Sequence, residues 1–249
     1  MSTRRLATAL LFVSLLALPA AAARVRAVRS GLPFPVPPVT GQCHTFGLVQ
    51  AGLKATYVTE VQGGPVNFTI TYISDAPTQT VTTQTVTTPQ GNATVETRVD
   101  GEIVGNLRAL KHIYTKSISV VPVIGNIVTE VDIDFVPSLA MGPAQGWCVG
   151  HTWQVAPSAQ TITTRSIAGT QVITGHTIAS EGVVLAVGES VTTPAGTFQT
   201  VKYRANTVSS SGGVSPTITW VSMEHNIVVK QDTLDASGAV TSVTTLVGL

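Results

Sequence analysis

The chain has 249 residues, of which 43% are hydrophobic and only 11% charged, so it can bury a sizeable core and is too apolar to be a disordered tail. Valine and threonine dominate, and because β-branched side chains crowd a helix but suit a pleated sheet, an all-helical fold is excluded. With a formal net charge of +1, we expect no nucleic-acid partner.

Residues 1–23 have the three parts of an export signal. Arg4 and Arg5 give a basic start, an apolar stretch follows, and small residues end at Ala23, an order that predicts cleavage near that position. The apolar stretch is shorter than the roughly 20 residues that span a bilayer. We therefore expect an exported protein, periplasmic or extracellular, without a transmembrane anchor.

Residues 24–40 are rich in proline, which removes backbone donors and favours an extended linker. A single β domain is predicted to follow at residues 41–249. Cys43 and Cys148 are the only cysteines. In an oxidising compartment an even number favours a disulfide, and two buried free thiols are the alternative.

Short alternating runs dominate the rest of the chain and indicate strands with one buried face. Phe68 and Ile70 share one face of such a run, and Val131 and Ile133 share one face of another. Turn residues, mainly Gly, Pro, Asn and Asp, separate the runs. The predicted strands lie near residues 55–61, 66–72, 94–99, 127–135, 161–167, 183–187, 197–205, 217–222, 227–231 and 239–247.

Two segments depart from this pattern. Large apolar residues recur at helical spacing from Ile103 to Tyr114, behind a potential N-cap at Asp100, so one short helix is predicted over about 101–114. Residues 79–88 are rich in threonine on both faces, which leaves their register poorly specified. They are interpreted as either an edge strand or a long loop.

An internal echo bears on the architecture. Residues 41–43 recur as residues 146–148, and residues 86–91 recur at the same offset as residues 191–196. The echo suggests that residues 41–145 and 146–249 are two halves related by duplication. A composition biased toward valine and threonine is the alternative explanation.

The sequence lacks the common hydrolase, phosphate-binding and dinucleotide-binding motifs. Glu224 and its neighbours read as a turn in which Asn226 tolerates a positive φ. Glu130, Asp132 and Asp134 share one face of one strand; a calcium site is one interpretation, but a solvated strand face is favoured because calcium ligands usually converge from a loop. We predict no catalytic residue, no cofactor and no metal.

The second half resembles the TapB-like group of uncharacterised secreted bacterial proteins. The resemblance covers residues 146–249, and Asn226 stands where that group usually has glycine. It is carried by Gly150-His151-Thr152-Trp153, Val187-Gly188-Glu189-Ser190-Val191, Thr193-Pro194-Ala195-Gly196-Thr197-Phe198, Thr219-Trp220 and Ile227-Val228-Val229-Lys230.

That group is similar in turn to the open half-barrel of LolA/LolB-like lipoprotein carriers. The resemblance implies a mainly all-β fold in which a curved antiparallel sheet, open as a half-barrel, holds an apolar ligand under a helical lid. Within the TPAGTF motif, Pro194 and Gly196 are expected to shape a turn and Phe198 to enter the core. These are structural roles, and fold alone does not assign function.

Three classes of function follow. The first is a non-enzymatic binding protein that holds a lipid or other apolar ligand against Phe68, Ile70, Val131 and Ile133, or docks a cell-envelope protein. The second is a structural or surface-interaction protein, which a solidly packed interior would favour. The third, a hydrolase, has the least support because no catalytic constellation is present.

Overall fold

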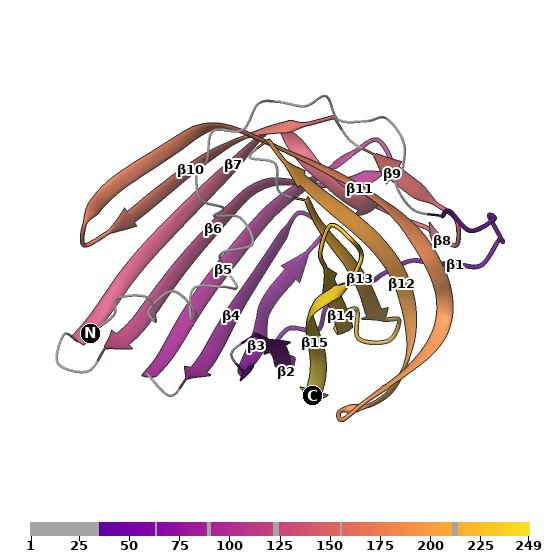
Figure 1. Ribbon diagram of the computed structural model, residues 1–249, viewed down its shortest axis with the longest axis horizontal. Helices are drawn as coiled ribbons and strands as arrows, with labels where there is room; N and C mark the ends of the chain where they lie inside the picture. The colour runs from indigo at the N-terminus through magenta and orange to yellow at the C-terminus, as the bar shows by residue number, and fades with distance from the viewer. Residues whose placement is uncertain (1–34, 63, 89–90, 122–124, 155, 211–213) are drawn as a thin grey trace.

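The computed structural model describes residues 35–249 except 63, 89–90, 122–124, 155 and 211–213 (Figure 1). The predicted signal peptide at 1–23 and residues 24–34 of the predicted linker lie outside the described residues. No helix occurs in the part that is described. The strands are β1 (Cys43–His44), β2 (Lys54–Val61), β3 (Gly64–Ala76), β4 (Gln79–Thr88), β5 (Gly91–Val104), β6 (Leu107–Val121), β7 (Gly125–Pro143), β8 (Trp147–Cys148), β9 (Thr152–Gln154), β10 (Ser158–Ser166), β11 (Gly169–Thr193), β12 (Gly196–Ser209), β13 (Val214–Ser222), β14 (Val228–Leu234) and β15 (Val240–Gly248).

Twelve of these strands form one closed antiparallel barrel. Their order is β10-β7-β6-β5-β4-β3-β2-β15-β14-β13-β12-β11, and β11 pairs again with β10. Closure depends on Ile178 of β11, which pairs with Ser158 of β10 on one edge and Ser209 of β12 on the other. The predicted open half-barrel is therefore wrong: β11, at 25 residues, is long enough to join both free edges of the sheet.

The predicted helix is also wrong. Residues 101–114 form the end of β5 and the start of β6, joined by a hairpin in which Val104 pairs with Leu107. Gly105 has φ 60, a left-handed conformation that glycine adopts without steric cost and that ends a helix but suits this turn. The apparent helical spacing arises because a hairpin and a bulge interrupt the alternation.

Residues 79–88 form a strand with two neighbours, not an edge strand or a loop. This strand, β4, pairs with β3 through Phe68 and Val86 and with β5 through Gln84 and Val95. Its register is set by these two partner strands, whose own alternation is clear. Weak local patterning was therefore resolved by long-range pairing.

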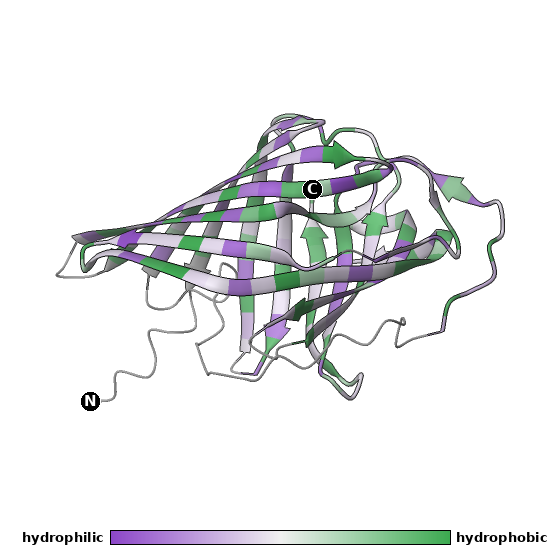
Figure 2. Cartoon of the chain, turned by 90° about the horizontal axis from the view of Figure 1, so that it is seen from above, coloured by the Kyte–Doolittle hydropathy of each residue, from purple (hydrophilic) through white to green (hydrophobic). Residues whose placement is uncertain are grey.

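The strand registers divide the side chains into an inward and an outward set. Tyr57 of β2 and Phe68 of β3 are paired, and they are 3% and 5% exposed; the face that carries them is the interior. Their neighbours Val58 and Asn67 face outward. Figure 2 shows the resulting alternation of hydrophobic and hydrophilic residues along the strands.

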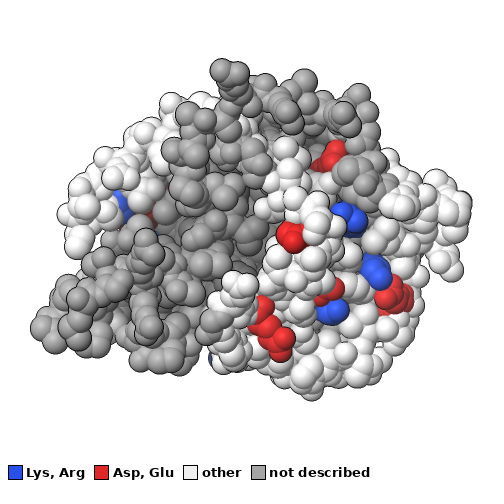
Figure 3. Space-filling view, in the orientation of Figure 1, with Lys and Arg blue, Asp and Glu red and all other residues white. Residues whose placement is uncertain are grey.

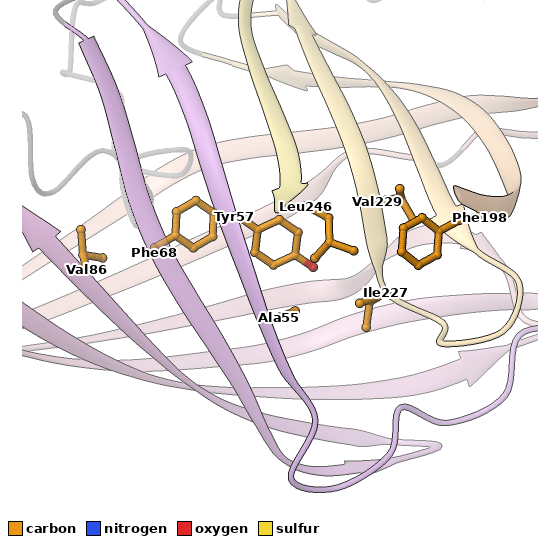
Figure 4. Close-up of a cluster of buried hydrophobic side chains, with 8 residues drawn as sticks. All are labelled: Ala55, Tyr57, Phe68, Val86, Phe198, Ile227, Val229 and Leu246. Atoms are coloured by element: carbon orange, nitrogen blue, oxygen red, sulfur yellow. The ribbon is translucent and has the colours of Figure 1, made fainter. Parts of the chain in front are cut away.

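Among the described residues, buried hydrophobic side chains form three clusters. The first lies across β4, β3, β2, β15, β14 and β12 (Figure 4). The second joins β7, β10 and β11, and the third gathers around Trp153 and Val184. The separation of the buried side chains into clusters matters because a barrel of twelve strands is wider than one of about eight strands, whose interior side chains fill completely.

Hairpin closures repeat at a fixed offset. Val61 pairs with Gly64, and Ser166 pairs with Gly169; likewise Thr88 pairs with Gly91, and Thr193 with Gly196. Each second pair follows the first by the 105 residues that also separate the two cysteines. Duplication of residues 41–145 as 146–249 stays a prediction, and these closures are the ones it would produce.

Candidate functional site

The four predicted ligand-binding residues all face the interior, but in two separate places. Phe68 and Ile70 belong to the first cluster, and Val131 and Ile133 to the second. Their strands, β3 and β7, are separated by β4, β5 and β6. Four strand spacings of about 4.8 Å place the two pairs roughly 19 Å apart along the wall. The structure therefore brings each pair together without joining the pairs.

The inner wall between these pairs carries no charge. Aliphatic, hydroxyl and amide side chains alternate there, and none of the inward positions on β4, β5, β6, β7 and β10 that continue the rows through Phe68 holds Asp, Glu, Lys or Arg. These positions are Thr82, Gln84, Val86, Ala93, Val95, Thr97, Val99, Ile113, Thr115, Ser117, Ser119, Ile127, Thr129, Val131, Ile133, Phe135, Ser158, Gln160, Ile162 and Thr164.

Several side chains of this wall keep partial exposure. Ile70, Ile113 and Val131 face inward yet are only partly buried, whereas Ile133 is 3% exposed. Ile173, inward on the projecting β10–β11 hairpin, is 42% exposed. The wall thus combines buried apolar side chains with apolar side chains that remain accessible, which is unusual for a fully packed core.

The β10–β11 hairpin lies at one end of the barrel. The other end is covered by residues 42–53, which we call the strap. Cys43 and Cys148 are joined by a disulfide with Cα atoms 3.9 Å apart, which confirms the predicted bridge and pairs β1 with β8. Phe46 of the strap packs against Trp147 with ring centroids 5.3 Å apart, within the third cluster. The disulfide therefore fixes one end of the strap beside an aromatic group.

The rest of the strap is held by two polar side chains of the barrel. Asn226 accepts a hydrogen bond from the Gly47 amide at 3.1 Å and donates one to the Leu48 carbonyl at 3.2 Å. Asp75 accepts one from the Val49 amide at 2.7 Å. Asn226 has φ 59, so the predicted turn with a left-handed residue is confirmed. Sequence reasoning missed the strap because its partners are distant in the chain.

The TPAGTF motif forms the hairpin between β11 and β12. Thr193 pairs with Gly196, and the Thr193 hydroxyl accepts a hydrogen bond from the Ala195 amide at 3.2 Å. Phe198 is 8% exposed and belongs to the first cluster, beside Ala195. Pro194 and Ala195 form the turn, and Thr197 pairs with Thr192 at the start of β12, so the geometry is that of a structural motif.

The acidic row of β7 lies on the outer surface, where its carboxylates meet basic side chains. Asp134 is 2.8 Å from His112 Nδ1, Asp132 is paired with Arg165, and Glu130 is 3.9 Å from Lys116. Among the described residues no group of His, Cys, Asp and Glu is arranged to hold a metal ion. Figure 3 shows positive and negative residues interspersed on the described surface.

In the described part of the barrel, three inward side chains bury a nitrogen that has no hydrogen-bond partner: Gln84 Nε2, Gln160 Nε2 and Trp153 Nε1. Trp153 lies in the third cluster, near the strap. Gln84 and Gln160 lie on the uncharged wall. Sequence reasoning missed both, although a glutamine at an inward position of an alternating strand is a signal that could have indicated them.

Comparisons with known proteins establish no family. No protein-family model matches the sequence, and no curated protein matches it. Two solved structures are similar over 83% of this chain and 99% of theirs: a "putative exported protein with YmcC-like fold" from Bacteroides fragilis NCTC 9343, with TM-score 0.41 and 11% identity, and a "putative lipoprotein" from Parabacteroides distasonis ATCC 8503, with TM-score 0.35 and 12% identity. Both likenesses are too distant to assign a function, and the TapB-like resemblance stays a prediction.

No helix in the described part of the chain is long and apolar enough to cross a membrane.

Proposed function

We propose that this protein is an exported, non-enzymatic binding protein that holds an apolar ligand against the inner wall of its barrel. The observation that carries the proposal is the uncharged wall with accessible apolar side chains, including Ile70, Ile113 and Val131. Burial of such surface against a ligand is favourable at about 25 cal/mol per Å². The strap covers one end, so a ligand enters from the end that carries the β10–β11 hairpin.

The absence of an enzymatic role is part of the same proposal. Acid–base chemistry needs titratable groups that meet at the site. The acidic side chains of β7 face outward and are paired with Arg165, Lys116 and His112. The wall itself offers hydroxyl and amide groups, which can orient a ligand but carry no charge.

Two valines of β7 give a matched test of binding. Val131 faces inward, and Val128 faces outward with 37% exposure. We expect Val131→Glu to weaken binding of the uncharged fluorescent probe N-phenylnaphthylamine at least roughly tenfold, because the carboxylate must stay hydrated. Val128→Glu should leave binding unchanged. The neutral pair Val131→Thr and Val128→Thr repeats the comparison if the inward carboxylate prevents folding. Equal effects of the two positions would contradict the proposal.

Export is tested by the intact mass of protein taken from its own host. Cleavage near Ala23 is expected from the order of the leader segments. A mature chain that retains Met1 would contradict export, and it would do so independently of any binding result.

A structural or surface-interaction role is the second candidate. It is favoured by apolar side chains on the projecting β10–β11 hairpin, where Ile167 is 80% and Val172 59% exposed. Such exposure is typical of interaction surfaces when it is contiguous. Ile167→Ser would then abolish cell-envelope association in pull-down assays, while the binding proposal expects no change in probe affinity.

A further inference from the structure

Gln160 is a buried polar side chain in the second cluster's part of the wall. It is 5% exposed and faces inward from β10. Its register partners are Phe135 of β7 and His176 of β11, and Ile162 follows two positions along its own strand. A primary amide therefore lies on the inner face between the apolar side chains of Phe135 and Ile162 on one side and the imidazole of His176 on the other.

The Nε2 atom of Gln160 has no hydrogen-bond partner within the protein. An amide N–H removed from water and left unpaired costs free energy, and native structures rarely keep one without a reason. Glutamine as such does not explain it, because Gln231, also inward, donates to the Thr219 hydroxyl at 3.1 Å. Gln160 differs from Gln231 because no acceptor in the protein pairs with its Nε2 atom.

The second unpaired amide of the wall has the same character. Gln84 of β4 also buries an Nε2 without a partner. Both groups are donors, so the group that would satisfy them is an acceptor. A cationic ammonium head has no acceptor to offer. An ionised carboxylate is also disfavoured, because none of the wall positions named above on β4, β5, β6, β7 and β10 holds a Lys or Arg to compensate its burial.

We propose that the ligand is a neutral fatty-acyl compound, such as an ester, whose carbonyl oxygen accepts a hydrogen bond from Gln160 Nε2. Its alkyl chain then lies against Ile113 and Val131, the partly buried apolar side chains packed against the same cluster. The inference rests on the proposed function and narrows it from any apolar ligand to one with an uncharged oxygen acceptor. Gln84 offers a second donor across the wall to a longer or second acyl group.

The test compares ligands of similar length that differ in the acceptor. Methyl decanoate carries the carbonyl, and undecane lacks it; decanoate carries a charge. Each displaces N-phenylnaphthylamine from the wild-type protein, from Gln160→Leu and from the control Gln231→Leu, whose amide already has a partner. Leucine fills similar space without a donor.

We expect Gln160→Leu to weaken methyl decanoate roughly tenfold, the value of one lost hydrogen bond of this kind, and to leave undecane unchanged or slightly tighter. Gln231→Leu should affect the two ligands equally. Decanoate should compete less well than the ester. In the ligand-free protein, Gln160→Leu should raise resistance to denaturant, because an unpaired donor is removed.

Equal effects of Gln160→Leu on methyl decanoate and undecane would overturn the inference while leaving the proposed function in place, since the wall would then bind alkyl chains without reading the oxygen. A protein that binds neither ligand nor probe would overturn both. Lower stability of ligand-free Gln160→Leu would show that the amide is satisfied within the protein, and it would also overturn the inference.

Discussion

Gly182 packs so closely against the Trp153 indole that no side chain fits at position 182. Gly182 of β11 pairs with Trp153 of β9, and a Cβ placed there would overlap carbon atoms of the indole ring. We expect Gly182→Ala to lower the free energy of unfolding by about 1–3 kcal/mol, the usual cost of forcing a packed ring aside. At Gly248 the nearest side-chain atom to a Cβ is 3.7 Å away, so Gly248→Ala is the control in denaturant unfolding. Equal losses at both positions would contradict this account.

Asn226 combines a backbone role with a side-chain role, and two substitutions separate them. It adopts φ 59 and binds both Gly47 and Leu48 of the strap. Asn226→Gly keeps the left-handed backbone but loses both hydrogen bonds, whereas Asn226→Ala loses both and adds strain. We expect Asn226→Ala to cost about 1–3 kcal/mol in chemical denaturation and Asn226→Gly less. Equal unfolding free energies for the two variants would show that the left-handed backbone at residue 226 does not contribute to stability.

Among the elements, the strap is the one most dependent on covalent linkage. The disulfide closes a loop with a sequence separation of 105 residues, for which the chain-entropy model gives on the order of 4 kcal/mol as an upper figure. We expect the double variant Cys43→Ser/Cys148→Ser to lose part of this stability and to exchange the amides of Gly47 and Val49 faster. The amide of Val95 in β5 serves as the control. Unchanged protection at Gly47 would show that Asn226 and Asp75 hold the strap without the disulfide.

The elements also show what the sequence could and could not predict. Alternation located strands around Phe68 and Val131 because one face of each is buried, and the turn at Asn226 followed from local chemistry. The segment from Ile103 to Tyr114 misled because a hairpin at Gly105 and a bulge imitate helical spacing. Local patterns cannot distinguish these cases, since only strand pairing decides between them.

The site was predictable to a smaller extent. The four apolar residues face inward as the alternation predicted, but their separation along the wall depends on the order of five strands. Closure through Ile178 and the contacts of the strap join residues far apart in the chain. Alternation alone could have placed Gln160 on the inner face, but its unpaired amide depends on the neighbouring strands and is not visible in the sequence.

At the scale of the whole molecule, closing the sheet into a ring removes most unpaired strand edges, which protects against edge-to-edge association. The same closure turns Tyr57, Tyr72 and Tyr203 toward the interior, in the first and third clusters. Burial raises the pKa of each phenol, because a phenolate would lose its hydration. The interior therefore favours the neutral form of three tyrosines at once.

This predicts a loss of stability at alkaline pH. Burial, with a further contribution from the Asp75 carboxylate, raises the pKa of Tyr72 to about 12, against about 10 in the unfolded chain. Below about pH 10 both states keep the proton and the full stability is present; above it the unfolded chain releases protons first, so stability falls until the folded pKa is reached.

Tyr72 alone accounts for roughly 3 kcal/mol of this loss between about pH 10 and 12, at about 1.4 kcal/mol per unit. Denaturant unfolding followed across this range, together with tyrosinate absorbance, measures it. Tyr72→Phe cannot ionise, so its stability should fall less steeply with pH than that of the wild type, whatever its stability at neutral pH. Parallel slopes for the two proteins would mean that water reaches the Tyr72 hydroxyl in the folded state, and the interior would then be wetter at this position than its burial indicates.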